Sequence, residues 1–385
     1  MTTSVTPWSP LSLGCGALLR NRFFLAPMTT NSSNADGGVS DAELAYIRRR
    51  CIGQFAAAIT SCAYVHEDGR SWQGIGAAQD VHLASLKAVS DAMRAGGGLA
   101  ILQLYDGGRL ADPKIVAPAR IRAPSAVRSL RPGALIPRAM SGQDVDAVIA
   151  AFVRAAQLGE AAGFNGIELH GANHYLLHQF FSPRSNQRTD QWGGSAENRM
   201  GFPLALTQAV RQAVSASMIV GYRINAFESE AGGYALADAA ALCGRLCDVG
   251  VDYIHISMDD FRKSPMREDR DWTAPTRQTG QLDNPITALS HAVGERAAVI
   301  ASGGIKSREA ACDALDAGAS LLAVGRAALI DPEWLDKLAR DDLGAIRREL
   351  PATGARIEAD LTIPAPMVRY ILSRPGWMPR EAAPQ

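Results

Sequence analysis

The sequence lacks an excess of charge of one sign. It contains 39 Lys and Arg residues against 39 Asp and Glu residues, so the formal net charge at pH 7 is zero. A protein without a global positive field does not attract nucleic acid or anionic membrane, and neither is expected as a partner. Any anion-binding site must therefore be local.

The sequence also lacks a long apolar run. No uninterrupted stretch approaches the roughly 18 residues needed to span a bilayer. The first ten residues, MTTSVTPWSP, have neither the basic start nor the apolar centre of a secretory signal, so we expect a cytoplasmic protein. Apolar residues make up 47% of the chain and charged residues 20%, which predicts a globular protein with a large core.

Cysteine is sparse and scattered. The six cysteines show neither the dense spacing of a secreted disulfide scaffold nor the paired CxxC spacing of a zinc or iron–sulfur site. This distribution favours a reducing compartment. Cys243 and Cys247 would lie one helical turn apart, but no second pair of ligands is nearby, so we expect no bound metal.

Short apolar runs rich in β-branched residues alternate with longer amphipathic stretches, a pattern typical of repeated βα units around a parallel sheet. Eight strands are predicted, over residues 23–27, 56–62, 99–104, 166–170, 218–224, 252–257, 297–302 and 320–325. Eight such strands predict closure into a single-domain α/β fold, the (β/α)8 TIM barrel. Barrels of this type reach a length of 385 residues once loops are added.

The amphipathic stretches predict helices between these strands. The clearest begins with a capping-box pattern at Ser141 and Asp144 and ends at Gly163. The other predicted helices cover residues 198–215, 236–249, 283–294, 307–317 and 332–341.

Two long segments, about 105–140 and about 258–282, follow predicted strands. In a barrel they belong to the C-terminal face, where loops shape the site. We expect the barrel to occupy residues 1–345. A C-terminal extension, residues 346–385, would then pack on the barrel or on a partner subunit.

Glycine-rich turns follow the last two predicted strands. Ser302, Gly303 and Gly304 follow the seventh, and Gly325 and Arg326 follow the eighth. Glycine lets backbone N–H groups approach an anion, and arginine can contact a phosphate with two N–H groups. Because this end of a TIM barrel is a recurrent phosphate site, the pattern predicts a phosphorylated ligand or cofactor. The alternative is that these glycines only form tight turns.

The densest polar cluster is HGANHYLLH, residues 170–178, directly after the fourth predicted strand. Polar residues at the C-terminal end of a barrel strand point into the mouth of the active site. His170 and Asn173 could therefore converge on one ligand oxygen, with Tyr175 beside them as a proton donor.

The same cluster has two other interpretations. His170, His174 and His178 recur every four residues and could line one helix face as metal ligands, as in a metal-dependent barrel hydrolase. No Glu or Asp lies between them as the HExxH pattern requires, which argues against this reading. The cluster could also be an ordinary packed loop.

From about residue 8 to 340 the sequence resembles the old yellow enzyme family of FMN-dependent oxidoreductases. The matching motifs occur in family order and are APMT (26–29), QL (103–104), the run 170–199, VGYR (220–223), SGG (302–304) and GR (325–326). The end of the long run, SPRSNQRTDQWGGSAENRMGF, is highly specific. The resemblance implies FMN as the cofactor and NAD(P)H as the reductant.

The resemblance also implies which residues hold FMN. Pro27 and Met28 would line the flavin ring, Thr29 would bond its O4 atom, and Cys62 would lie beside it. Gln103 would pair with the pyrimidine edge, and Arg223 would lie near N1 and O2, where negative charge collects in the reduced flavin. The phosphate cradle would comprise Ser302, Gly303, Gly304, Gly325 and Arg326.

For the substrate, the resemblance implies that His170 and Asn173 hold the carbonyl oxygen of an electron-poor alkene. Tyr175 would donate a proton to the α-carbon while hydride reaches the β-carbon. Because no GxGxxG follows the first predicted strand, NAD(P)H must use the substrate site in turn, which predicts ping-pong kinetics. Two alternatives remain: a nitro, free-flavin or quinone reductase on the same scaffold, and a flavin-binding protein without turnover.

Three residues depart from the family pattern. Tyr105, expected to contact substrate, stands where many relatives have tryptophan or another aromatic residue. Asp106 replaces a common histidine, and His174 stands where glycine is usual. These departures leave the shape of the substrate open, and the resemblance also leaves open a homodimer.

Overall fold

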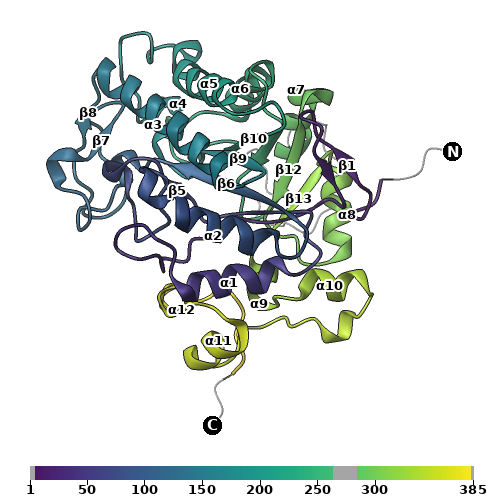
Figure 1. The fold of residues 1–385 in the computed structure, drawn as a ribbon. Coiled ribbons are helices and arrows are strands. Elements are labelled where there is room, and N and C mark those ends of the chain that lie inside the picture. Colours follow the sequence, from purple (N-terminus) through teal and green to yellow (C-terminus); the bar gives the residue numbers. More distant parts are fainter. Residues whose placement is uncertain (1–4, 263–283, 383–385) are drawn as a thin grey trace.

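The structure is a computed structural model that describes residues 5–262 and 284–382 (Figure 1). Within these ranges, eight parallel strands form a closed barrel. They are β3 (Phe23–Leu25), β4 (Ala57–Ile59), β6 (Leu99–Tyr105), β9 (Gly166–Gly171), β10 (Ile219–Ile224), β11 (Tyr253–Ile256), β12 (Ala298–Ser302) and β13 (Leu321–Val324). Pairing of β4 with both β3 and β6 closes the ring. The predicted TIM barrel and all eight of its strands are confirmed.

The helices lie outside the barrel (Figure 1). They are α1 (Asp41–Cys51), α2 (Leu83–Arg94), α3 (Gly142–Ala161), α4 (Leu176–Phe181), α5 (Ala196–Ala213), α6 (Leu236–Asp248), α7 (Pro285–Val293), α8 (Arg308–Asp316), α9 (Arg326–Ile330) and α10 (Trp334–Ala339). The predicted cap of α3 is present: the Asp144 N–H donates to Ser141 Oγ at 3.2 Å, and the Ser141 N–H donates to Asp144 Oδ2 at 2.7 Å. None of the described helices is long and apolar enough to cross a membrane.

A small hairpin covers the N-terminal end of the barrel. Its strands β1 (Leu11–Ser12) and β2 (Leu18–Leu19) pair antiparallel. Leu13 and Leu19 belong to the same buried cluster as Phe24 and Tyr253, which lie on barrel strands. A second, larger cluster fills the layer between strands and helices. Because apolar side chains close the N-terminal end, a ligand has to enter from the C-terminal end of the strands.

The long segment after β6 begins at that end. It contains the paired strands β7 (Arg122–Ala123) and β8 (Arg138–Ala139). Asp106 and Arg122 form a buried ion pair of 2.8 Å that ties the start of this segment to its middle. The second long segment, about 258–282, lies outside the described residues from position 263 onward.

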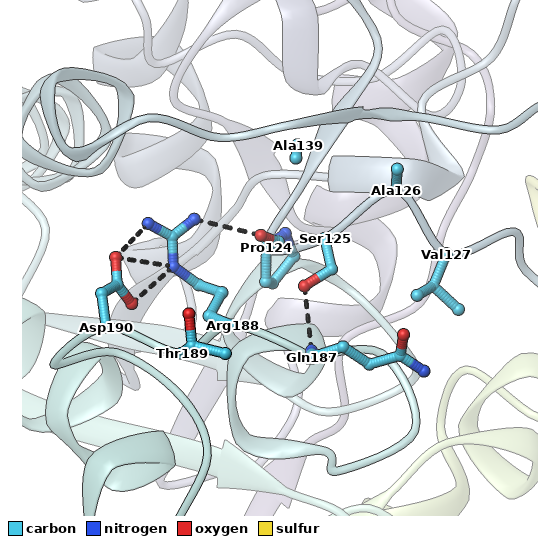
Figure 2. A pocket seen from close by; sticks show the side chains of 9 residues that line it. All are labelled: Pro124, Ser125, Ala126, Val127, Ala139, Gln187, Arg188, Thr189 and Asp190. Carbon is cyan, nitrogen blue, oxygen red and sulfur yellow. Dashed lines mark hydrogen bonds and ion pairs between the residues drawn. The ribbon is translucent and has the colours of Figure 1, made fainter.

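The run that follows α4 fastens this loop segment to the barrel. Residues 124–127, Ala139 and 187–190 line a groove of about 430 Å³. Figure 2 shows their side chains. Beside the groove Arg188 donates to the carbonyl oxygen of Pro124 at 3.0 Å and pairs with Asp190. The guanidinium of Arg188 already binds the carboxylate of Asp190 and two main-chain carbonyl oxygens. Because these bonds connect two loops, we interpret the groove as the boundary between the loops and not as a ligand site.

The C-terminal extension packs on α1 and α9. Its helices α11 (Gly354–Leu361) and α12 (Ala365–Leu372) lie beside them (Figure 1), in a buried cluster with Tyr46 and Leu329. Arg50, fully buried on α1, donates to the carbonyl oxygen of Leu361 at 3.0 Å, and its guanidinium lies 4.0 Å from the centre of the Tyr46 ring. The extension is thus attached by apolar packing and by one buried cation.

Replacing Ile357 on α11 tests this attachment. Ile357 is fully buried, so Ile357→Ala is expected to destabilise the protein by about 2–5 kcal/mol through lost transfer energy and the resulting cavity. Thermal unfolding and limited proteolysis of the extension measure the effect. The neighbouring exposed Glu358 supplies the control: Glu358→Ala should change stability by no more than about 0.5 kcal/mol. Equal effects of the two changes would contradict this account.

Candidate active site

A buried carboxylate organises the interior of the barrel below its C-terminal end. Glu168 on β9 accepts hydrogen bonds from Gln103 Nε2 at 2.5 Å, from the Tyr253 hydroxyl at 3.0 Å and from His255 Nδ1 at 2.9 Å. Burial alone raises the pKa of Glu168, but the charge and hydrogen bond of His255, together with Arg223, hold it below its usual value. The carboxylate is therefore ionised and joins three strands.

The strand register places the predicted residues above this carboxylate. On β9, Glu168 and His170 are two positions apart and so face the same side of the sheet. Gln103 pairs with Glu168 across β6 and β9, and Arg223 pairs with both His170 and His255 from neighbouring strands. Four strands thus bring these side chains together.

His170 is held as a neutral hydrogen-bond donor. Burial, and then the nearby charge of Arg223, lowers its pKa well below the ordinary value. Its Nδ1 atom accepts the Ala172 N–H at 3.3 Å, so the ring proton lies on Nε2. The residue can therefore donate a hydrogen bond to a ligand oxygen without being charged.

Asn173 lies at the exposed mouth in a left-handed conformation, with φ of 56°. Its Oδ1 atom accepts from the Ser257 hydroxyl at 3.1 Å, and its N–H donates to Asn225 Oδ1 at 2.6 Å. These bonds orient the amide and leave its Nδ2 hydrogens to donate to a ligand. The sequence did not indicate Asn225 or Ser257, because their contacts with Asn173 join residues that are far apart in the chain.

Tyr175 lies in an aromatic group beside His170. The two ring centres are 4.9 Å apart and nearly perpendicular. Burial raises the pKa of Tyr175 well above its ordinary value, so its hydroxyl stays protonated. Tyr105 contacts Tyr175 at 5.2 Å and stacks parallel on Trp72 at 4.7 Å.

Two of the departures from the family pattern have structural roles. Tyr105 is fully buried, and its hydroxyl accepts the Ser71 N–H at 3.1 Å. A direct contact between Tyr105 and substrate stays a prediction, while the structure makes this ring a support for Tyr175. Asp106 is fully buried and pairs with Arg122. The third departure, His174, is partly exposed.

Arg223 has unused hydrogen-bonding capacity. Among the described residues its buried Nε atom has no hydrogen-bond partner. Burial lowers its pKa and Glu168 opposes this, and an arginine side chain remains charged at neutral pH. Cys62 lies in the same region; burial raises the pKa of its thiol, which is therefore protonated. The site thus contains one partly buried cation whose Nε atom has no partner among the described residues.

The two glycine turns form a cradle at the ends of β12 and β13. Gly303 and Gly304 have φ of 86° and 75°, and a Cβ atom added to Gly303 would lie 2.5 Å from main-chain atoms of residues 258 and 259. Arg326 donates to the carbonyl oxygen of Asp259 at 2.8 Å. The Ser302 hydroxyl is used internally, donating to the Ile256 carbonyl oxygen at 2.5 Å, so Ser302 can offer a ligand only its main chain.

Pro27, Met28 and Thr29 follow β3 at the same end of the barrel. All three are partly or fully exposed, and a Cβ atom on Gly325 would lie 3.4 Å from Met28 Sδ. The loop after β3 therefore adjoins the turn after β13.

The histidine series does not lie on one helix face, so that interpretation is wrong. His170 is on β9, and Asn173 and His174 are both left-handed, which reverses the chain before α4 begins at Leu176. His174 and His178 nevertheless meet, with ring centres 4.5 Å apart. Both face Glu228, from the segment after β10.

Comparison with known proteins identifies the family. The sequence profile described as "NADH:flavin oxidoreductase / NADH oxidase family" matches residues 8–342. The chain belongs to this family. Membership confirms the resemblance to old yellow enzymes, the FMN cofactor, the nicotinamide reductant and the oxidoreductase class.

Several members are similar over most of this chain. "Probable NADH-dependent flavin oxidoreductase YqiG" of Bacillus subtilis is 35% identical over 377 residues, or 97% of each protein. "NADH:fumarate oxidoreductase" of Klebsiella pneumoniae is 36% identical over 97% of this chain, which spans only 39% of that protein. Morphinone reductase bound to tetrahydroNAD superposes with a TM-score of 0.75 at 25% identity, covering 94% of this chain and 98% of that one.

The residues present fit the family's cofactor. The Arg223 Nε atom without a partner among the described residues suits the electron-rich edge of a flavin, and the left-handed turn at Gly303 and Gly304 suits main-chain N–H groups that bind a phosphate. Sequence reasoning found these residues through family motifs. It missed Glu168 and His255, which lie within apolar strand runs and offered no motif.

Replacing Glu168 tests the role of the buried carboxylate. Glu168→Gln is expected to lower stability at pH 7 by about 3–5 kcal/mol, because three donors lose an ionised acceptor. The contribution is complete above the unfolded carboxyl pKa of about 4.3 and is lost as pH falls through the lower folded pKa. The gap in unfolding temperature between wild type and variant should therefore shrink below about pH 4.

The control for this experiment is Asp146→Asn, at an exposed position of α3, which should show almost no gap at either pH. A gap for Glu168→Gln that stays constant from neutral pH into acid would contradict the assignment of an ionised Glu168.

Proposed function

We propose that this protein is an NAD(P)H-dependent ene-reductase that reduces the activated C=C bond of α,β-unsaturated carbonyl compounds or related electron-poor alkenes. One observation supports the proposal: neutral His170 lies beside protonated Tyr175, and the oriented amide of Asn173 is in the turn between them, directly after β9. Two of these groups can donate to one oxygen, and the third holds a proton.

In this proposal each FMN contact comes from residues already described. Pro27, Met28, Thr29, Cys62 and Gln103 would surround the flavin ring, and Arg223 would face its N1 and O2 edge. The main chain at Ser302, Gly303, Gly304 and Gly325, with Arg326, would hold the phosphate. These residues would hold FMN, which would supply the hydride chemistry: hydride from NAD(P)H would pass by way of the flavin to the β-carbon of the alkene.

The protein's own residues then prepare the substrate. His170 Nε2 and Asn173 Nδ2 would bind the carbonyl oxygen and stabilise the negative charge that develops there. The Tyr175 hydroxyl would supply the proton to the α-carbon. His170 and Asn173 would also hold the carboxamide of the nicotinamide. Reductant and substrate would therefore bind alternately at one site, in ping-pong order. We also propose that the protein acts in the cytoplasm.

The glycine cradle can be tested by FMN binding alone. Gly303→Ala is expected to give protein that retains little FMN, because the new Cβ would meet the main chain of residues 258 and 259. The control is Gly376→Ala in the extension, where φ is 79° and no other atom lies within 4 Å. That variant should suffer only the roughly 1–2 kcal/mol cost of a left-handed backbone and bind FMN normally. Equal FMN titration curves for the two variants would disprove the cradle.

Tyr175→Phe separates ene-reduction from its alternative. We expect alkene reduction to fall by about 10²- to 10⁴-fold, while anaerobic flavin reduction by NAD(P)H stays close to wild type, since only the alkene step needs the proton. Reduction of a nitro compound or quinone should also persist. If the variant reduces enones as fast as wild type and oxidises NAD(P)H at the same rate, the acid role of Tyr175 is wrong. If wild type itself reduces enones far more slowly than nitro compounds, quinones or free flavin, the alternative becomes the better proposal.

A further inference from the structure

The cluster of His174, His178 and Glu228 is not used by the proposed reaction. The side chains of His178 and Glu228 are each 1% exposed, whereas His174 is 37% exposed. His178 Nε2 lies 3.0 Å from Glu228 Oε1, and His174 Nδ1 lies 3.7 Å from the same oxygen. Two imidazoles from the turn after β9 therefore converge on one carboxylate oxygen from the segment after β10.

We propose that His174, His178 and Glu228 form a binding site for a divalent transition-metal ion of the zinc type. Imidazole nitrogen and carboxylate oxygen are the ligands that such ions prefer. This departs from our expectation from the sequence that the chain binds no metal, which rested on the lack of an HExxH pattern and of paired cysteines.

The geometry suits a metal ion. One ligand atom from each residue lies within 4.8 Å of the other two. In a tetrahedral zinc site, with bonds of about 2.0–2.1 Å, ligand atoms lie about 3.3 Å from one another. The separations of 3.0 and 3.7 Å from Glu228 Oε1 bracket this value. The exposed edge of His174 gives the ion a path from solvent and leaves room for water to complete its coordination.

The carboxylate is held in place for this role. Glu228 Oε2 accepts from the Ser182 hydroxyl at 2.6 Å and from the Tyr234 N–H at 3.2 Å, which turns Oε1 toward the histidines. Such outer partners orient metal ligands in known sites. Among the described residues, the ion-pair partners of Glu228 are histidines alone, with no Lys or Arg. A second carboxylate, Glu230, lies 3.5 Å from His174 Nε2 and adds to the negative potential.

A metal here would join two loops beside the substrate. His174 lies between Asn173 and Tyr175, and His178 is on α4, which begins directly after Tyr175. Glu228 belongs to the segment that also carries Asn225, the partner of the Asn173 N–H. The bound ion would thus restrain the turn that holds two of the proposed substrate ligands, without touching the flavin residues.

The experiment measures metal binding to untagged, FMN-loaded protein that has been freed of metal with a chelator. Zn²⁺ is titrated by equilibrium dialysis, and Co²⁺ is added as a spectroscopic probe at wavelengths beyond the flavin absorption. Wild type should bind one equivalent tightly, give the absorption of tetrahedral or five-coordinate Co²⁺ with nitrogen ligands, and unfold at a higher temperature with Zn²⁺.

Two variants remove ligands. His174→Gly suits the left-handed φ of 62° and so should fold well, yet it should weaken Zn²⁺ binding by about 100-fold or more, since even outer partners contribute tenfold to 100-fold. His178→Gln should act in the same way. His291→Gln, at an exposed histidine of α7, is the matched control and should bind like wild type.

Binding by wild type that is no tighter than binding by His174→Gly would overturn the proposal and leave a hydrogen-bonded cluster only. An equal loss of binding in His291→Gln would also overturn it, because the ion would then bind surface histidines without selection. Neither readout depends on turnover, so failure of the ene-reductase proposal would not be mistaken for failure of this one.

Discussion

The ionised Glu168 is the constraint on which the interior of this barrel depends. A carboxylate with no exposed surface is tolerated only when hydrogen bonds replace its water, and here Gln103, Tyr253 and His255 do so from two other strands. Tyr253 reaches it because its strand neighbour is Gly221: a Cβ atom there would lie 2.0 Å from the Tyr253 ring. The apolar barrel thus carries one polar layer, and the proposed catalytic residue His170 lies two positions beyond Glu168 on the same strand.

This layer also explains the electrostatics of the mouth. Arg223 lies near Glu168 on one side and His170 on the other, so it compensates the carboxylate and helps to keep the histidine neutral. A cation can stay buried here because the negative charge below it is fixed. The same cation has an Nε atom without a partner among the described residues, which suits a ligand edge that gains negative charge. Glu168 and Arg223 therefore balance each other's charge inside the barrel, and in the proposed function the same arginine faces the flavin.

The fold could be predicted from the sequence because its signals are local. Alternating apolar runs located the eight strands, and Ser141 with Asp144 located the start of α3 within one residue. The proposed active-site trio, His170, Asn173 and Tyr175, was inferred from its position after a strand and from family motifs. Glu168 and His255 were missed because a single polar residue in an apolar run looks the same whether it faces a helix or the barrel interior.

Other features depend on contacts between distant residues. The histidine spacing of four predicted a helix face, but left-handed Asn173 and His174 turn the chain. The carboxylate that His174 and His178 contact belongs to Glu228, 54 residues beyond His174. Asp106 looked like a change in substrate contact, whereas Arg122 neutralises it within the loop. No sequence pattern near His174 or Asp106 predicts these partners.

The attachment of the C-terminal extension has a consequence for anyone who redesigns this chain. Met28, from the loop expected to line the flavin, packs at the edge of the cluster that α1 and the extension share. Cutting the chain at residue 345 would bare the Tyr46 face of α1 and take away the carbonyl that Arg50 binds. The extension therefore supports the loop that carries Met28 from behind, and in the proposed function a change in the extension would reach the flavin through this loop.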